Sequence, residues 1–214
     1  MPTVVCYGDS NTWGYDPASG ERFAPDVRWP GVMRRHLPPG FEVIEEGLCG
    51  RTTIFDDPFM EKRNGLDYLT PCLDSHAPID LVVLMLGTND LKGFLNTDAA
   101  QIARGAGRLV EVIKASGAGP GDLAPRVLLV APTPVTDGGA QGELWGFAGA
   151  PERARPLAGF LRMVAEDKGC AFLDAGQLIQ TSPLDGVHFD AAAHQRLGRT
   201  VAEQVARLFA SPRP

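Results

Sequence analysis

Residues 4–11 read VVCYGDSN and place a serine directly behind a short apolar run. The β-branched and aromatic residues of that run suit a buried strand, and the residues that follow it are turn formers. The stretch therefore predicts a strand over residues 3–7 that ends at Gly8, Asp9 and Ser10. A serine at the end of a buried strand makes Ser10 the first candidate catalytic residue.

The rest of the chain alternates apolar runs with segments of helical spacing. The runs predict strands over residues 3–7, 41–45, 81–86, 126–131 and 170–173. Helical spacing predicts helices over residues 29–37, 64–75, 98–116, 151–168 and 191–209. Strand alternating with helix is typical of an α/β fold, in which a parallel sheet carries helices on both faces.

Composition narrows the function classes. The 214 residues are 44% hydrophobic and 21% charged, which predicts one globular domain over residues 1–214. A net charge of −6 without a basic run argues against nucleic-acid binding. The longest apolar run is too short for a membrane span, and no secretory leader is evident, so we expect a cytoplasmic protein.

Polar residues follow the predicted strands, at the edge of a parallel sheet where ligands bind. They read GDSN at 8–11, GLCGR at 47–51 and GTND at 87–90, and DGVH at 185–188 lies beyond the fifth strand. A serine hydroxyl needs a base to take its proton and a third group to orient that base. Asp185 and His188 are three residues apart on a predicted loop, so they complete a triad with Ser10.

The oxyanion of a tetrahedral intermediate needs preorganised donors, and losing one donor slows the reaction by about 10²–10³. Glycines at strand ends let backbone N–H groups approach a ligand, and asparagine offers a side-chain amide. The candidates are the backbone N–H groups of Ser10 and Gly50 and the side chain of Asn89. Asp9 is expected to bond the amides of its turn.

Taken together, the four blocks resemble the SGNH hydrolases, also called the GDSL esterase family. The blocks are GDS at 8–10, GLCGRTT at 47–53, GTND at 87–90 and DGVH at 185–188. The stretches ERFAPDVRW, FEVIEEGL and LMLGTND are similar to the bacterial arylesterase branch, whose members also transfer acyl groups to alcohols.

The resemblance implies a flavodoxin-like three-layer α/β/α sandwich with strand order 2-1-3-4-5. It also implies ester hydrolysis through an acyl-serine intermediate, with no cofactor and no metal. Ser10 is then the nucleophile, His188 the general base and acid, and Asp185 its orienting partner, while Ser10, Gly50 and Asn89 form the oxyanion hole. The four cysteines show no CxxC pair or zinc-like spacing with histidine and are read as free thiols.

The chain departs from the branch in two positions of interest. Asn11 stands where the family usually has leucine, and Cys49 stands where the branch has serine; a catalytic thiol at Cys49 is a weaker alternative to a packing substitution. The expected substrate pocket comprises Asn11, Trp13, Trp145, Phe147 and Val187. Of the remaining histidines, His194 is expected on the surface of the last helix.

These patterns predict a serine esterase for small, short-chain acyl esters of aryl or alkyl alcohols. The resemblance to the arylesterase branch implies acyl transfer to alcohols as a further activity. A carbohydrate O-deacetylase with the same triad is an alternative within enzymes. A noncatalytic flavodoxin-like binding module is an alternative from another class. Self-association into a homo-oligomer is left open.

Overall fold

In the computed structural model, which describes residues 1–210, the predicted parallel sheet is present with the order β2-β1-β3-β4-β5. The α/β fold and its strand order are thereby confirmed. The strands are β1 (Thr3–Gly8), β2 (Glu42–Gly47), β3 (Leu81–Met85), β4 (Arg126–Ala131) and β5 (Ala171–Asp174). The single-domain prediction also covers residues 211–214, which lie outside the described residues.

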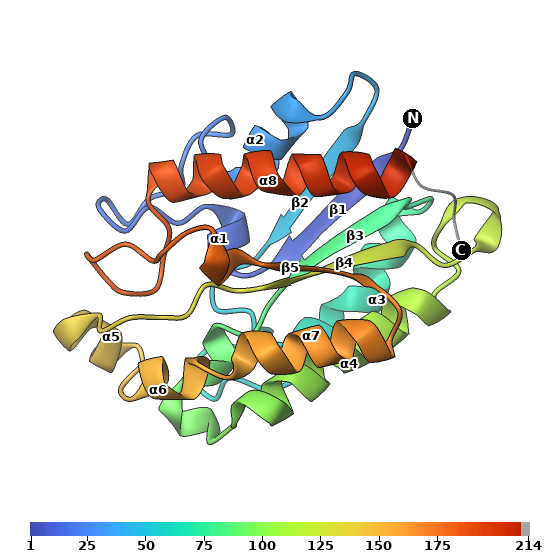
Figure 1. Cartoon of the computed structure of the whole chain (residues 1–214). Coiled ribbons are helices and arrows are strands. Elements are labelled where there is room, and N and C mark those ends of the chain that lie inside the picture. Colours follow the sequence, from blue (N-terminus) through green and yellow to red (C-terminus); the bar gives the residue numbers. More distant parts are fainter. Residues whose placement is uncertain (211–214) are drawn as a thin grey trace.

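Helices cover both faces of the sheet (Figure 1). One face carries α2 (Trp29–His36) and α8 (Ala191–Ala210), and the other carries α3 (Gly65–His76), α4 (Ala99–Ala115) and α7 (Leu157–Asp167). Short helices α1 (Ser10–Trp13), α5 (Gly139–Leu144) and α6 (Ala150–Ala154) lie at the end of the sheet where the strands terminate.

Alternating side chains of the central strands divide the core in two. Val5 and Tyr7 of β1 pack on the side of α3, α4 and α7. Val4 and Cys6 pack on the side of α2 and α8. Every residue of β1 and β3 is buried, because both strands are central and covered on both faces, and this explains their unbroken apolar runs.

The helix expected over residues 151–168 is in fact two helices, α6 and α7. Pro156 separates them, because proline has no backbone N–H to continue the helical ladder. Helix α5 lies in a segment for which the helical spacing predicts no helix. Aspartates cap two of the long helices: Asp98 forms a capping box with Gln101 at the start of α4, and Asp190 accepts the N–H of Ala193 at 2.8 Å at the start of α8.

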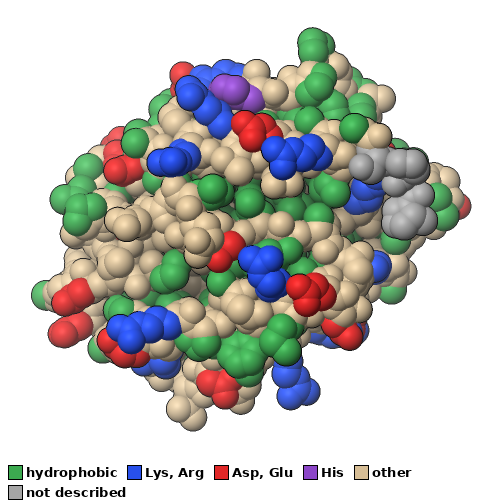
Figure 2. All heavy atoms as spheres, in the orientation of Figure 1, with side chains coloured by type: hydrophobic (Ala, Val, Ile, Leu, Met, Phe, Trp, Pro, Cys, Tyr) green, Lys and Arg blue, Asp and Glu red, His purple; other side chains and the backbone are tan. Residues whose placement is uncertain are grey.

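Charged side chains are distributed without a block of one sign on the face shown in Figure 2, where basic and acidic groups are interspersed. No helix within residues 1–210 has both the length and the apolar character needed to cross a bilayer.

The expectation that His194 is a surface residue is wrong. His194 is fully buried where α2 packs on α8, its ring lies against Phe23 and Phe189, and Nδ1 accepts the Trp29 N–H at 3.2 Å. Burial disfavours the charged imidazole, and nearby positive charge adds to this effect, so the pKa of His194 falls from 6.5 to about 3.

We therefore predict that His194 makes the fold acid-sensitive. Between pH 6.5 and about 3 the unfolded chain binds a proton that the folded chain does not, so the free energy of unfolding falls by about 1.4 kcal/mol per pH unit as pH decreases through this window. The variant His194→Asn keeps an acceptor for Trp29 and takes no proton. Urea denaturation at several pH values should show a shallower loss for this variant; parallel curves would contradict the prediction.

Candidate active site

Three polar side chains meet at the carboxyl edge of the sheet. Ser10 begins α1 directly after β1, and Asp185 and His188 lie in the loop before α8. The Ser10 Oγ lies 2.9 Å from His188 Nε2, and His188 Nδ1 lies 2.7 Å from Asp185 Oδ2. The structure thus brings together the serine, imidazole and carboxylate that the sequence places far apart.

Asp185 is held as a carboxylate by donors from its own loop. Its Oδ1 accepts the backbone N–H groups of Val187 and His188, both at 2.9 Å. Burial alone raises the pKa of Asp185, but the hydrogen bonds from His188 and Val187 outweigh burial and bring the pKa below its ordinary value. An ionised carboxylate at this position orients the imidazole, with Nδ1 as donor and Nε2 facing the serine.

The turn that carries Ser10 is shaped by its neighbours. Asp9 caps α1 by accepting the N–H of Asn11 at 2.9 Å, as expected for a structural aspartate. Burial raises the pKa of Asp9 to about 6. Gly8 permits the close approach of α1, since a Cβ there would lie 2.1 Å from Thr12 Oγ1. The tight turn presents Ser10 at the end of the strand.

The predicted oxyanion donors lie on two neighbouring loops. Gly50 follows β2 with a φ of 83°, which favours glycine, and Asn89 follows β3. Both line the same cavity as Ser10 and His188. The Asn89 amide donates one hydrogen bond to the Arg51 carbonyl at 3.1 Å, and a side-chain amide carries a second N–H that can serve a ligand.

A buried carboxylate that the sequence argument missed ties these loops together. Asp90 is fully buried and accepts the N–H of Thr53 at 2.9 Å and the Thr53 hydroxyl at 2.5 Å. Burial raises the pKa of Asp90 to about 6. The polar residue beside Asn89 in GTND was the available signal, but its partner lies 37 positions away in sequence.

The cavity at Ser10 has a volume of about 670 Å³. The predicted residues Trp145, Phe147 and Val187 line it, and so do Tyr15 and Phe94, which were not predicted. The Tyr15 ring lies 4.2 Å from the His188 ring, and the Trp145 ring meets the His188 ring edge-on at 5.6 Å. Aromatic rings therefore surround the imidazole and form an apolar wall.

Two predicted pocket residues do not line this cavity. Asn11 is buried and bonds the backbone at Val187 and Phe189, because one step along α1 turns its side chain away from Ser10. Trp13 is half-buried and lies under the Arg22 guanidinium, 5.1 Å from ring centroid to Cζ. Both predictions are corrected.

Two charged groups on the cavity wall, Lys92 and Asp57, are paired with each other. Lys92 Nζ contacts Asp57 Oδ2 at 2.9 Å, and both residues are buried. Burial tends to raise the pKa of Asp57, but bonds from Lys92 and backbone N–H groups outweigh burial and lower it. The pair therefore adds little net charge to the cavity.

Cys49 also lines the cavity. Burial, with a further contribution from Asp9, raises the pKa of its thiol to about 11. The thiolate is the nucleophilic form of cysteine, so a protonated thiol at neutral pH favours the packing interpretation over catalysis.

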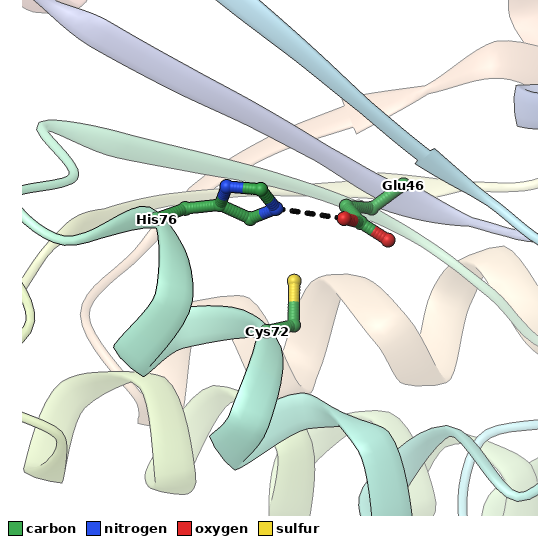
Figure 3. Close-up of side chains that lie close together, drawn as sticks. All are labelled: Glu46, Cys72 and His76. Carbon is green, nitrogen blue, oxygen red and sulfur yellow. Dashed lines mark hydrogen bonds and ion pairs between the residues drawn. The ribbon is translucent and has the colours of Figure 1, made fainter.

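One group of side chains within residues 1–210 offers metal-ligand atoms, namely Glu46, Cys72 and His76 (Figure 3). Cys72 and His76 are four residues apart in α3 and therefore lie on one face of the helix, a spacing that the sequence prediction did not consider. His76 Nε2 and Glu46 Oε1 lie 2.7 Å apart, and burial raises the pKa of Cys72 to about 12. His76 and Glu46 are therefore paired with each other, and the Cys72 thiol stays protonated at neutral pH. We interpret the three side chains as a packing contact between β2 and α3.

The family match and the similar solved structures given next show that the chain is a carboxylic ester hydrolase. Residues 6–196 match the model of the GDSL-like Lipase/Acylhydrolase family. The chain belongs to that family. A comparison with curated proteins returned no match.

Two of the similar solved structures are esterases of different kinds. The native aryl esterase of M. smegmatis is 42% identical, with 97% of this chain and 100% of that chain covered and a TM-score of 0.92. Est24, a carbohydrate acetylesterase from Sinorhizobium meliloti, is 39% identical, with 98% and 100% covered and a TM-score of 0.93.

We predict that Asp90→Asn destabilises the fold by about 1–3 kcal/mol, because an amide turned toward Thr53 replaces an acceptor and leaves a buried donor unpaired. Urea denaturation at pH 7 measures the loss. The matched variant Asp74→Asn, at an exposed position of α3, should change stability by less than about 0.5 kcal/mol. Equal effects of the two substitutions would refute the structural role of Asp90.

Proposed function

We propose that Ser10 is the nucleophile of this esterase, that His188 is its general base and acid, and that Asp185 orients the imidazole. The observation that carries the proposal is the unbroken hydrogen-bond chain from Ser10 through His188 to Asp185 at an apolar cavity. His188 Nε2 takes the hydroxyl proton as Oγ bonds to the ester carbonyl carbon, and then gives that proton to the departing alkoxide. Water repeats the sequence on the acyl-serine and releases the acid.

The negative oxygen formed in each step needs donors that are already in place. We assign this role to the backbone N–H groups of Ser10 and Gly50 and to the Asn89 amide. Two observations support this assignment. Gly50 and Asn89 line the same cavity as Ser10, and the hydrogen bonds between Asp90 and Thr53 join the loop after β3 to the loop after β2.

The proposed substrates are short-chain acyl esters of aryl or alkyl alcohols. Support comes from the aromatic wall made by Tyr15, Phe94, Trp145 and Phe147, and from the similarity to an aryl esterase. The largely apolar lining of the cavity would also bind the carbon chain of an alcohol, which supports acyl transfer to alcohols as a further activity.

A second candidate function is O-deacetylation of carbohydrates. The similarity to the carbohydrate acetylesterase Est24 favours it, and so does Glu143 on the cavity wall, which offers a carboxylate to a sugar hydroxyl.

The proposed partner is a small-molecule ester in the cytoplasm, with no nucleic acid and no membrane. The interspersed charge on the face shown in Figure 2 supports this assignment, and so do the four free cysteines, which suit a reducing compartment. Phe59 and Leu144 are 77% and 79% exposed and line the cavity, and their exposure supports self-association into a homo-oligomer.

Removal of the nucleophile or the base should abolish most activity. Ser10→Ala and His188→Ala are each expected to lower kcat for p-nitrophenyl acetate by about 10³-fold or more. An organophosphonate should label the unmodified protein and fail to label Ser10→Ala. Near-normal turnover by either variant, with the fold intact by circular dichroism, would rule out this assignment.

A substrate panel separates the two candidate functions. We expect kcat/KM to be highest for p-nitrophenyl acetate, to decline toward the octanoate, and to exceed that for acetylated xylo-oligosaccharides. Trp145→Ala should reduce the rate on the aryl ester more than on methyl acetate, because the ring contacts only a bulky alcohol or acyl group. Faster cleavage of the acetylated oligosaccharide would favour the deacetylase.

A further inference from the structure

The side chain of Asn11 bonds the polypeptide on both sides of His188. Its Nδ2 donates to the Val187 carbonyl at 3.2 Å, and its Oδ1 accepts the Phe189 N–H at 3.1 Å. Asn11 is only 2% exposed, so both bonds form away from solvent. One amide thus holds the two peptide groups that flank the imidazole-bearing residue.

We propose that Asn11 is a positioning residue that keeps His188 facing Ser10 through the catalytic cycle, an inference that rests on the proposed role of His188 as the base. Asn11 follows Ser10 on α1, so its amide fixes the His188 backbone to the same short helix that carries the nucleophile.

The other backbone hydrogen bonds of this loop do not tie it to α1. Asp185 lies in the loop itself, and the Ser182 N–H bonds the His188 carbonyl from within it. The Thr136 N–H bonds the Gly186 carbonyl and so ties the loop to the segment after β4. These contacts shape the loop or join it to another segment, whereas those of Asn11 join it to α1.

The Tyr15 ring, just after α1, packs 4.2 Å from the His188 ring, but a ring contact does not hold the His188 backbone. Within residues 1–210, the remaining hydrogen bond between this loop and α1 is the one between Ser10 Oγ and His188 Nε2. That bond disappears in every turnover, because an acylated serine has no hydroxyl proton to donate. In the acyl-enzyme, the Asn11 amide keeps the imidazole in reach of the water that completes the reaction. Loss of the Asn11 side chain should therefore slow deacylation more than acylation.

The test compares Asn11→Leu and Asn11→Ser with the unmodified protein on p-nitrophenyl acetate. Leucine keeps a branched side chain of similar size, whereas serine leaves a small cavity, so the two variants differ in packing. Both lose the pair of hydrogen bonds from the Asn11 amide to Val187 and Phe189. We expect kcat to fall by about 10- to 100-fold, as misplacement of a catalytic group commonly does. KM should fall with kcat, and a burst of about one p-nitrophenolate per site should appear, because slow deacylation lets the acyl-enzyme accumulate.

The matched control is Thr12→Val. Thr12 is the next residue of α1, is fully buried, and has a hydroxyl without a hydrogen-bond partner among the described residues. This variant should keep kcat within about twofold and show no new burst. A similar loss of kcat in the control, or folded Asn11 variants with unchanged kcat and KM, would overturn the inference. Failure of the proposed function is seen separately, as continued turnover by Ser10→Ala.

A measurement on the unmodified sequence covers the case in which the Asn11 variants do not fold. After Ser10 is labelled with an organophosphonate, the side-chain amide protons of Asn11 should still exchange with solvent much more slowly than those of the exposed Asn96. Equal exchange rates in the labelled protein would show that the hydrogen bonds of the Asn11 amide break when the serine is modified, and would contradict the inference.

Discussion

The hydrogen bond between Ser10 Oγ and His188 Nε2 joins residues that are 178 positions apart, and the site depends on it. It forms because β1 is central in a parallel sheet and delivers Ser10 to the edge where the chain also arrives before α8. Loops after parallel strands converge at such an edge. The same topology brings Gly50 and Asn89 from the neighbouring strands, so one edge collects the groups to which we assign ester cleavage.

Buried polar side chains hold that edge in place. Asp9 caps the helix that starts at Ser10, Asp90 ties the loops of Gly50 and Asn89, and Asp185 orients His188. Burial raises the pKa of Asp9 and of Asp90 to about 6, whereas donors from its own loop lower that of Asp185. Asn11 completes this pattern as a neutral group, which binds both a carbonyl and an N–H at no cost in buried charge.

Sequence patterns were informative where a local rule applies. Apolar runs predicted the strands to within a residue or two, and the four blocks predicted which residues meet at the sheet edge. Side-chain direction was less accessible: Asn11 and Trp13 were placed in the pocket because they neighbour Ser10, yet a short helix turns each away. The burial of His194 depends on where α2 crosses α8, and no local pattern encodes that packing.

The central claim is that the acyl group passes through the Ser10 hydroxyl. Rapid acid quench during turnover of p-nitrophenyl acetate, followed by peptide mapping with mass spectrometry, locates the acyl group directly. We expect an acetyl group on the peptide that contains Ser10, at the hydroxyl of that residue. Acetylation at the Cys49 sulfur, or turnover without any acylated peptide, would contradict the account.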